Sequence, residues 1–169
     1  MPKLLSFPDP VNEKAARAVA AVVCALSIAT LATGAYWILA VLAYGFAARA
    51  ASGPTLSPLG QLATRLIAPR LGAAKPVPGP PKRFAQAIGA AFTTAGAAFA
   101  LVGGDAAVAA GLTATMIVAS GLEAALALCV GCQVFALLMR AGLIPRSVCE
   151  QCADIRLRTR RAPEGARAA

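Results

Sequence analysis

The chain has 169 residues, of which 59% are hydrophobic and only 14% are charged. A soluble domain carries about 25% charged residues, and here the apolar residues lie in long runs. The composition therefore indicates a membrane protein and excludes disorder for most of the chain. There is no histidine, which excludes His-based catalytic triads and His-ligated metal sites. The net charge of +9 would suit a nucleic-acid partner, unless membrane topology accounts for it.

Four segments are apolar and close to the length that a bilayer core of ~30 Å requires. Gly34 separates the first two, and a turn at 103–105 separates the last two, with Asp105 suited to cap the final helix. The second segment is short, and it needs either Arg49 to extend toward the membrane surface or the bilayer to thin locally. We expect an all-α membrane protein with four transmembrane helices in two hairpins, plus short interfacial or cytoplasmic helices. The four spans are Ala15–Thr33, Ala35–Ala50, Phe84–Val102 and Ala106–Leu128.

The positive charges fix the orientation of this four-span arrangement. All 16 Lys and Arg residues fall on one side of it, and the two opposite turns carry only Asp105. Basic loops stay in the cytoplasm, so we expect a multi-pass protein of the bacterial inner membrane with both termini cytoplasmic. The charge then reflects topology and contact with the lipid bilayer, and no nucleic-acid partner is expected. A cleaved signal peptide fits poorly, because Asp9 and Glu13 precede the first span and a second span follows at once.

The spans divide the chain into six parts. These are an N-terminal cytoplasmic segment (1–14), a transmembrane hairpin (15–51), a cytoplasmic loop (52–83), a second hairpin (84–128), a cysteine-rich cytoplasmic segment (129–158) and a basic tail (159–169). In the loop, Ser57 and Pro58 predict the start of a short helix, which lies on the inner leaflet or packs against the spans. Lys75–Pro81 predicts an extended, polyproline-like spacer. Val134–Leu143 is too short for a fifth span and predicts an interfacial helix.

Two CxxC motifs are the most specific chemical feature of the sequence. Cys129 and Cys132 form the first, and Cys149 and Cys152 form the second after sixteen intervening residues. This spacing is typical of a four-thiolate zinc site, and the same ligands could hold an iron–sulfur cluster. Permanent disulfides are not expected in the reducing cytoplasm. Thiol–disulfide exchange is the second interpretation, and simple packing of small apolar side chains is the third.

The exchange interpretation favours Cys149 as the nucleophile. Ser147 and Glu150 have the spacing of a capping box, which would place Cys149 in the first turn of a helix. Backbone amides there lower the pKa of a thiol, and Cys152, one turn later, would resolve the mixed disulfide. Cys129 and Cys132 would be a second redox pair. Cys129 is expected at the C-terminal end of the fourth span, where the helix dipole disfavours a thiolate unless Gly131 breaks the helix.

Glu123 is the one ionisable residue well inside a predicted span. Such residues are functional candidates by default, so Glu123 is a weaker candidate for the same chemistry. Its expected partners are Arg140, Arg17 or the hydroxyl of Thr30. Cys24, alone inside the first span, is expected to be a packed side chain.

Several short motifs together resemble the bacterial, actinobacterial-type membrane proteins grouped as DUF4395. The residues that carry the resemblance are Phe7–Asn12, Gly53–Gln61, Pro81–Gln86, Glu123 and the two CxxC motifs. This family has no settled biochemical function. Its members are often encoded near thioredoxin-like proteins and sulfurtransferases, so the resemblance implies a partner of one of these kinds.

The expected activity is thiol redox chemistry or sulfur relay at the cytoplasmic membrane face, with Cys149 and Cys152 as the exchanging pair. The alternatives are a structural or regulatory zinc or iron–sulfur site at Cys129, Cys132, Cys149 and Cys152, and a membrane scaffold for a cytosolic sulfur or thioredoxin-like enzyme. The sequence leaves open whether the protein is an enzyme.

Overall fold

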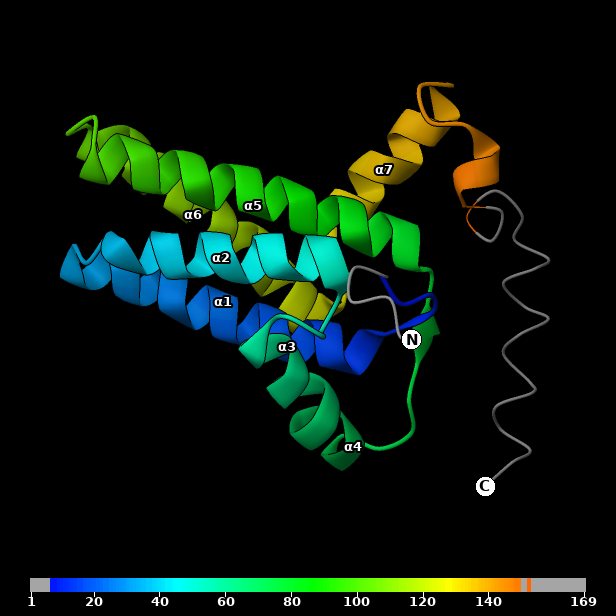
Figure 1. Cartoon of the computed structure of the whole chain (residues 1–169). Coiled ribbons are helices and arrows are strands. Elements are labelled where there is room, and N and C mark those ends of the chain that lie inside the picture. Colours follow the sequence, from blue (N-terminus) through cyan, green and yellow to red (C-terminus); the bar gives the residue numbers. More distant parts are fainter. Residues whose placement is uncertain (1–6, 150–151, 153–169) are drawn as a thin grey trace.

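The computed structural model of the chain describes residues 7–149 and 152, and most of these residues are helical (Figure 1). Within them, three helices are long and apolar enough to cross a membrane: α1 (Glu13–Thr33), α5 (Gly79–Leu101) and α6 (Ala106–Leu126). Two further apolar helices are shorter, namely α2 (Trp37–Ser52) and α7 (Val130–Arg140). The predicted all-helical architecture is confirmed, while α2 is shorter than a clear membrane span.

The remaining elements are short. Two-residue strands β1 (Val11–Asn12) and β2 (Pro76–Val77) pair antiparallel, with Val11 opposite Val77. The loop after α2 carries α3 (Pro58–Leu62), the π-helix η1 (Ala63–Ile67) and α4 (Ala68–Arg70). A 3₁₀ helix, η2 (Arg146–Val148), follows α7.

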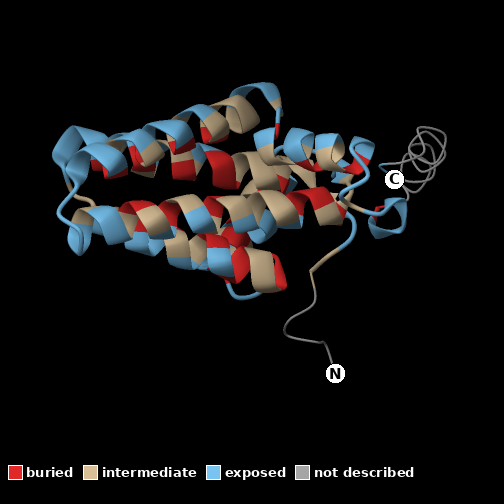
Figure 2. Ribbon diagram, turned by 90° about the horizontal axis from the view of Figure 1, so that it is seen from above, coloured by how far each residue is buried: buried red, intermediate tan, exposed pale blue. Residues whose placement is uncertain are grey.

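The long helices pack so that α1 lies along α6 and α2 lies along α5. In addition, α5 contacts both α6 and α7. Buried residues line the sides of the helices that face one another, while exposed residues occupy the outer faces (Figure 2). Those outer faces carry large apolar side chains such as Trp37, Tyr44 and Val118, each more than 60% exposed. An apolar exterior around a packed interior is what a lipid environment requires.

Glycine permits the close approach of α2 and α5. A Cβ added at Gly89 would lie 2.4 Å from Cε1 of Phe46, so no larger residue fits without movement. Hydroxyl groups along the buried faces bond to carbonyls of their own helices, as Thr93 does to Gly89 O at 2.7 Å. Small residues at such contacts are typical of helix pairs in membranes.

Two predicted helix starts are confirmed by their caps. The Asp105 carboxylate accepts a hydrogen bond from the Val108 amide at 3.1 Å, and the Ser57 hydroxyl accepts one from the Gly60 amide at 3.2 Å. The helix after Ser57 packs against α1, with Ala63 and Ala68 fully buried. Of the two arrangements expected for this short helix, on the inner leaflet or against the spans, the structure shows packing against α1.

The segment before α5 corrects the predicted spacer. Pro76 and Val77 are extended, but they pair with β1 and do not form a free polyproline stretch. Helix α5 begins at Gly79, five residues before the expected start at Phe84. Proline is tolerated in the first turn of a helix because its missing N–H would have no partner there. The early start places Lys82 inside the helix.

Of the two ways in which the short second span could be accommodated, extension of Arg49 away from the helices is not observed. The Arg49 side chain is buried, with the residue only 6% exposed, and its Nε donates to Oε1 of Gln86 at 2.8 Å. Its Nη1 donates to the Ser57 hydroxyl at 3.3 Å, and the guanidinium lies 4.7 Å from the centre of the Phe46 ring. The residue therefore ties α2 to α5 and to the start of α3.

Candidate functional site

An ion pair joins the beginning of α5 to the end of α6. Lys82 Nζ lies 2.5 Å from Oε1 of Glu123, and the two side chains are only 9% and 16% exposed. Arg140, Arg17 or Thr30 was expected as the partner of Glu123, and this prediction is wrong. Lys82 was not considered because the third span was predicted to begin after it, at Phe84. Arg17 instead donates to the carbonyls of Ala124 and Ala125 at the end of α6. Free carbonyls at a helix C-terminus favour such a cation.

The fourth predicted span ends earlier than expected, and this moves Cys129 to a different position. Helix α6 stops at Leu126, and Ala127 adopts a left-handed conformation with φ 58°. Cys129 then stands at the N-cap of the new helix α7, with extended backbone. The expectation that Cys129 lies at a helix C-terminus is therefore wrong. At an N-terminus the helix dipole favours a thiolate.

Cys129 and Cys132 form an unequal dithiol, one turn of α7 apart. The hydrogen bond between the two thiols lowers the pKa of Cys129, because Cys132 stabilises the Cys129 thiolate. Burial and the Glu123 carboxylate act in the opposite direction, while the Lys82 ammonium favours the thiolate. For Cys132 the same hydrogen bond and burial raise the pKa of its thiol. Of the two thiols, Cys129 therefore ionises more readily, and Cys132 retains its proton.

Helix α7 is held close to α5, which keeps the dithiol beside Lys82. A Cβ added at Gly131 would lie 2.6 Å from the Cβ of Ala85, so the two helices touch there. Further along α7, the rings of Phe135 and Phe84 stack edge to face with centres 5.5 Å apart. Gly131 thus does not break a helix; it allows the N-terminal turn of α7 to rest on α5.

Cys149 and Cys152 are joined by a disulfide. Cys149 is buried against Phe135 and Met139 of α7, whereas Cys152 is exposed. Ser147 is not the N-cap residue that the capping box requires, because it lies inside η2, whose N-cap is Pro145. Cys149 follows η2 directly. Glu150 lies outside the described residues, as do the basic tail and the first six residues of the N-terminal segment. The effect of a helix N-terminus on a thiol applies to Cys129, which is the N-cap of α7.

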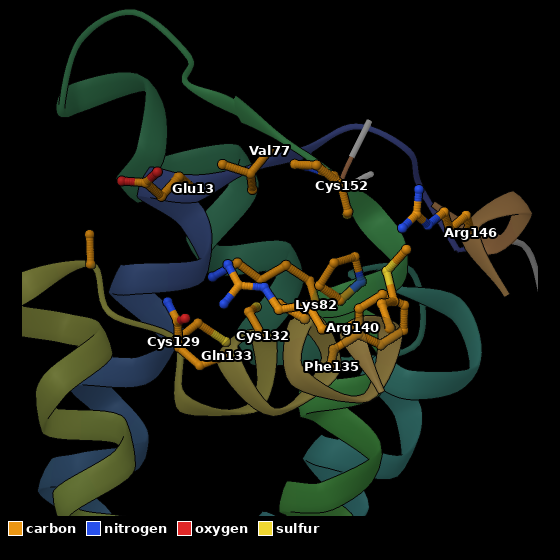
Figure 3. Close-up of a pocket in the computed structure, with 15 residues that line it drawn as sticks. Glu13, Val77, Lys82, Cys129, Cys132, Gln133, Phe135, Arg140, Arg146 and Cys152 are labelled. Carbon is orange, nitrogen blue, oxygen red and sulfur yellow. The ribbon is translucent and has the colours of Figure 1, made fainter. Parts of the chain in front are cut away.

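Three of the four CxxC cysteines, Cys129, Cys132 and Cys152, border one pocket of about 530 Å³, which we call the polar pocket because it has four charged lining residues (Figure 3). Cys129 and Cys132 lie on one side of this pocket in Figure 3, and Cys152 lies on the other. Its charged lining residues are Lys82, Arg140, Arg146 and Glu13, and the last of these pairs with Lys75 at 3.0 Å. The pocket thus brings together a thiol of lowered pKa, a disulfide sulfur and several positive charges.

The cysteines do not form a four-thiolate metal site in this structure. Among residues 7–149 and 152, no group of three or more Cys, Asp or Glu side chains lies close enough together to hold a metal ion. Cys149 and Cys152 are bonded to each other, which leaves two free thiols at Cys129 and Cys132. The zinc and iron–sulfur interpretations therefore find no support in this arrangement.

Three basic residues that line the pocket were not predicted as site residues from the sequence, namely Lys82, Arg140 and Arg146. Pro80 and Pro81 were the available signal for Lys82, because prolines suit the first turn of a helix. Cys24 lies apart from the site within α1, with its thiol 3.7 Å from the carbonyl of Ile117, as expected for a packed side chain.

Comparison with known proteins assigns a family and leaves the activity open. No curated protein and no solved structure matches the chain. The family model described as a domain of unknown function, DUF4395, matches residues 11–140, which include Lys82, Glu123, Cys129 and Cys132. The chain therefore belongs to the DUF4395 family, as its motifs predicted.

Proposed function

We propose that this protein is a membrane-embedded thiol–disulfide exchange protein, in which Cys129 and Cys132 are the reactive dithiol and Cys149 and Cys152 the second redox pair. The observation that carries the proposal is the shared pocket, where a thiol of lowered pKa and a disulfide sulfur face the same space. This assignment reverses the expected order of the two pairs. The reason is that Cys129 stands at the N-cap of α7.

The exchange conserves atoms and electrons within the chain. The Cys129 thiolate attacks the sulfur of Cys152, the bond between Cys152 and Cys149 breaks, and Cys149 leaves as a thiolate. Cys132 then loses its proton and attacks Cys129, which releases Cys152. The first pair ends oxidised and the second ends reduced. Because the pairs lie across the pocket from each other, the segment after α7 must move toward the start of α7 for this step.

The exposed sulfur of Cys152 is the point of contact for a soluble partner. Cys149 is buried beneath Phe135, so an external thiol reaches Cys152 first. We propose a cytoplasmic thioredoxin-like protein or sulfurtransferase as that partner. Arg140 and Arg146 at the pocket would favour a partner with an acidic rim.

We further propose that α2 also crosses the bilayer, which gives four spans in two hairpins with both termini cytoplasmic. Its 16 residues reach only roughly 24 Å at ~1.5 Å per residue. However, α2 packs along the length of α5, and its outer face carries exposed apolar side chains. Local thinning of the bilayer accommodates such a short span at modest cost.

Two double variants test the exchange within the chain. Cys132→Ser with Cys149→Ser leaves Cys129 facing Cys152, and Cys129→Ser with Cys149→Ser leaves Cys132 facing Cys152. Both are treated with glutathione disulfide, and the internal disulfide is identified by mass spectrometry. We expect the bond to Cys129 to form faster, since Cys129 keeps its place at the N-cap of α7 and the nearby Lys82 ammonium, which favours its thiolate. Equal rates, or no bond in either variant, would reject the assignment of Cys129.

A metal measurement separates this function from the zinc alternative. In a zinc protein all four thiols would react slowly with iodoacetamide and would become reactive together when a chelator is added. For an exchange protein we expect fast alkylation of Cys129 that a chelator does not change. One tightly bound zinc per chain, with protection that the chelator removes, would overturn the proposal.

A further inference from the structure

A second cavity lies among the long helices and meets the dithiol from the membrane side. This apolar crevice, of about 340 Å³, is bordered by residues from α1, α2, α5, α6 and the start of α7. Its volume falls within the range of small-molecule sites, roughly 300–1,000 Å³. Apolar side chains line most of it, and Glu123 and Cys129 stand among its polar groups. Representative apolar lining residues are Val19, Phe46, Phe92, Met116 and Ala119.

Cys129 is the cysteine that borders both cavities. Cys132 and Cys152 line only the polar pocket, whereas Cys129 lines the pocket and the crevice. The ion pair divides in the same way, with Lys82 on the pocket and Glu123 on the crevice. The nucleophilic thiol therefore stands in the wall between a space open to polar partners and a space among candidate membrane-spanning helices.

The chemistry of the crevice selects one class of occupant. A ligand that enters between these helices must be lipid-soluble, since their outer faces are apolar. A phosphate head group would bring negative charge against the Glu123 carboxylate, so a neutral polar head group fits better. The dithiol beside the crevice gives up two electrons when it forms a disulfide. A neutral, lipid-soluble acceptor of two electrons is a quinone, and quinones accept electrons from dithiol proteins.

We propose that the crevice binds the head group of an isoprenoid quinone, which oxidises the Cys129–Cys132 dithiol. The inference rests on the proposed function, because it requires that this dithiol be redox-active. In the reaction the two S–H bonds break and one S–S bond forms between Cys129 and Cys132. The two electrons and two protons pass to the two carbonyl oxygens of the quinone, which becomes a quinol. Thiol–disulfide exchange between the two pairs is reversible, so an oxidised Cys129–Cys132 pair takes two electrons from reduced Cys149 and Cys152 and restores their disulfide. The membrane quinone then oxidises the Cys129–Cys132 dithiol again.

Quinone reduction by a simplified protein tests this proposal. Cys149→Ser with Cys152→Ser leaves Cys129 and Cys132 as the reactive dithiol. The protein is reduced, freed of reductant, reconstituted in phosphatidylcholine vesicles and mixed with a ubiquinone that carries one isoprene unit. All ring positions of this quinone are substituted, so thiols do not add to it. We expect one quinol per chain by absorbance and a Cys129–Cys132 disulfide by mass spectrometry.

A matched pair of substitutions on α6 shows where the quinone binds. Ala119 lines the crevice, whereas its neighbour Val118 faces outward and is 62% exposed. Ala119→Phe fills the crevice and should slow quinone reduction by about tenfold or more, while Val118→Phe should leave the rate within about twofold of the parent. Oxidation of both variants by glutathione disulfide checks that the dithiol is intact.

The outcomes distinguish the two proposals. If glutathione disulfide oxidises the dithiol and ubiquinone does not, the quinone inference is wrong and the proposed exchange function stands. Equal rates for Ala119→Phe and Val118→Phe also reject the crevice as the quinone site. If neither oxidant forms the Cys129–Cys132 disulfide, the proposed function itself fails.

Discussion

Lys82 and Glu123 form the ion pair that connects the first turn of α5 to the last turn of α6, immediately beside Cys129. The pair is largely shielded from water, with side-chain exposures of 9% and 16%. Its two charges act on the same thiol in opposite directions, because Lys82 favours the Cys129 thiolate and Glu123 disfavours it. The pair therefore has two separable roles, one in holding the helices and one in setting the reactivity of the dithiol.

Breaking the pair should destabilise the protein. Lys82→Met or Glu123→Gln leaves the other charge buried without its partner, which costs about 3–5 kcal/mol for fully buried pairs. We expect values toward the lower end, because both side chains retain some exposure. Unfolding by sodium dodecyl sulfate in mixed micelles, followed by circular dichroism, measures the change.

The Lys75–Glu13 pair is the matched control. Its atoms lie 3.0 Å apart, but the Lys75 side chain is 65% exposed. Exposed ion pairs contribute about 0–1 kcal/mol, so Lys75→Met should change the free energy of unfolding little. If Lys75→Met and Lys82→Met reduced the free energy of unfolding equally, burial would not increase the contribution of the Lys82–Glu123 pair to stability.

The same two residues should shift the pH dependence of Cys129 in opposite directions. Alkylation by iodoacetamide follows the thiolate fraction, so its rate rises as pH passes through the pKa of the thiol. Lys82→Met removes a positive charge that stabilises the thiolate and should move this midpoint to higher pH. Glu123→Gln removes a negative charge and should move it to lower pH. A midpoint that moves the same way in both variants would indicate a change of structure and not of charge.

The sequence predicted most helices correctly because their signals are local. Long apolar runs locate α1, α5 and α6, and the short polar side chains of Ser57 and Asp105 mark helix starts through hydrogen bonds to amides three residues on. These features depend on residues within one or two turns. Pattern reasoning on a single chain detects them without knowledge of the tertiary structure.

The site could not be predicted in the same way, because it depends on where two helices end in space. Ala127 ends α6 in a left-handed conformation that glycine usually adopts, so the sequence contains no ordinary stop signal there. Because α6 ends there, Cys129 is the N-cap of α7 and does not lie at the C-terminus of α6. The partner of Glu123 lies 41 residues earlier in the chain, and that contact follows from the packing of α5 against α6.

The contact of α2 with α5 predicts unequal effects of two glycine substitutions. Gly89→Ala places a Cβ 2.4 Å from Phe46 Cε1, so the helices or the ring must shift. Overpacking of this kind costs about 1–3 kcal/mol. Gly111→Ala on α6 meets nothing within 4 Å and should be neutral or stabilising by up to about 1 kcal/mol. The same detergent unfolding measurement compares them, and equal stability of the two variants would contradict the close approach of α2 and α5.

The membrane orientation can be tested by reporter fusions at the ends of the helices. All 16 Lys and Arg residues lie on one side of a four-span arrangement, and positively charged segments stay in the cytoplasm. Alkaline phosphatase is active only outside the cytoplasm, because it requires disulfides, and green fluorescent protein fluoresces only inside when exported in unfolded form. Fusions after Thr33 and Gly104 should therefore give phosphatase activity, and fusions after Leu71 and Ala169 should give fluorescence.

The fusion after Leu71 decides whether α2 crosses the bilayer. If α2 did not cross the bilayer, the loop at Leu71 would lie outside the cytoplasm and the turn at Gly104 would lie inside it. Phosphatase activity would then appear after Leu71. The fusion at Ala169 decides the redox environment of both cysteine pairs. Fluorescence there places them among reduced cytoplasmic thiols, where a disulfide persists only if an oxidant renews it, which is the role proposed for the membrane quinone. Phosphatase activity at Ala169 would place the cysteines in an oxidising compartment and would exclude a cytoplasmic thioredoxin-like partner.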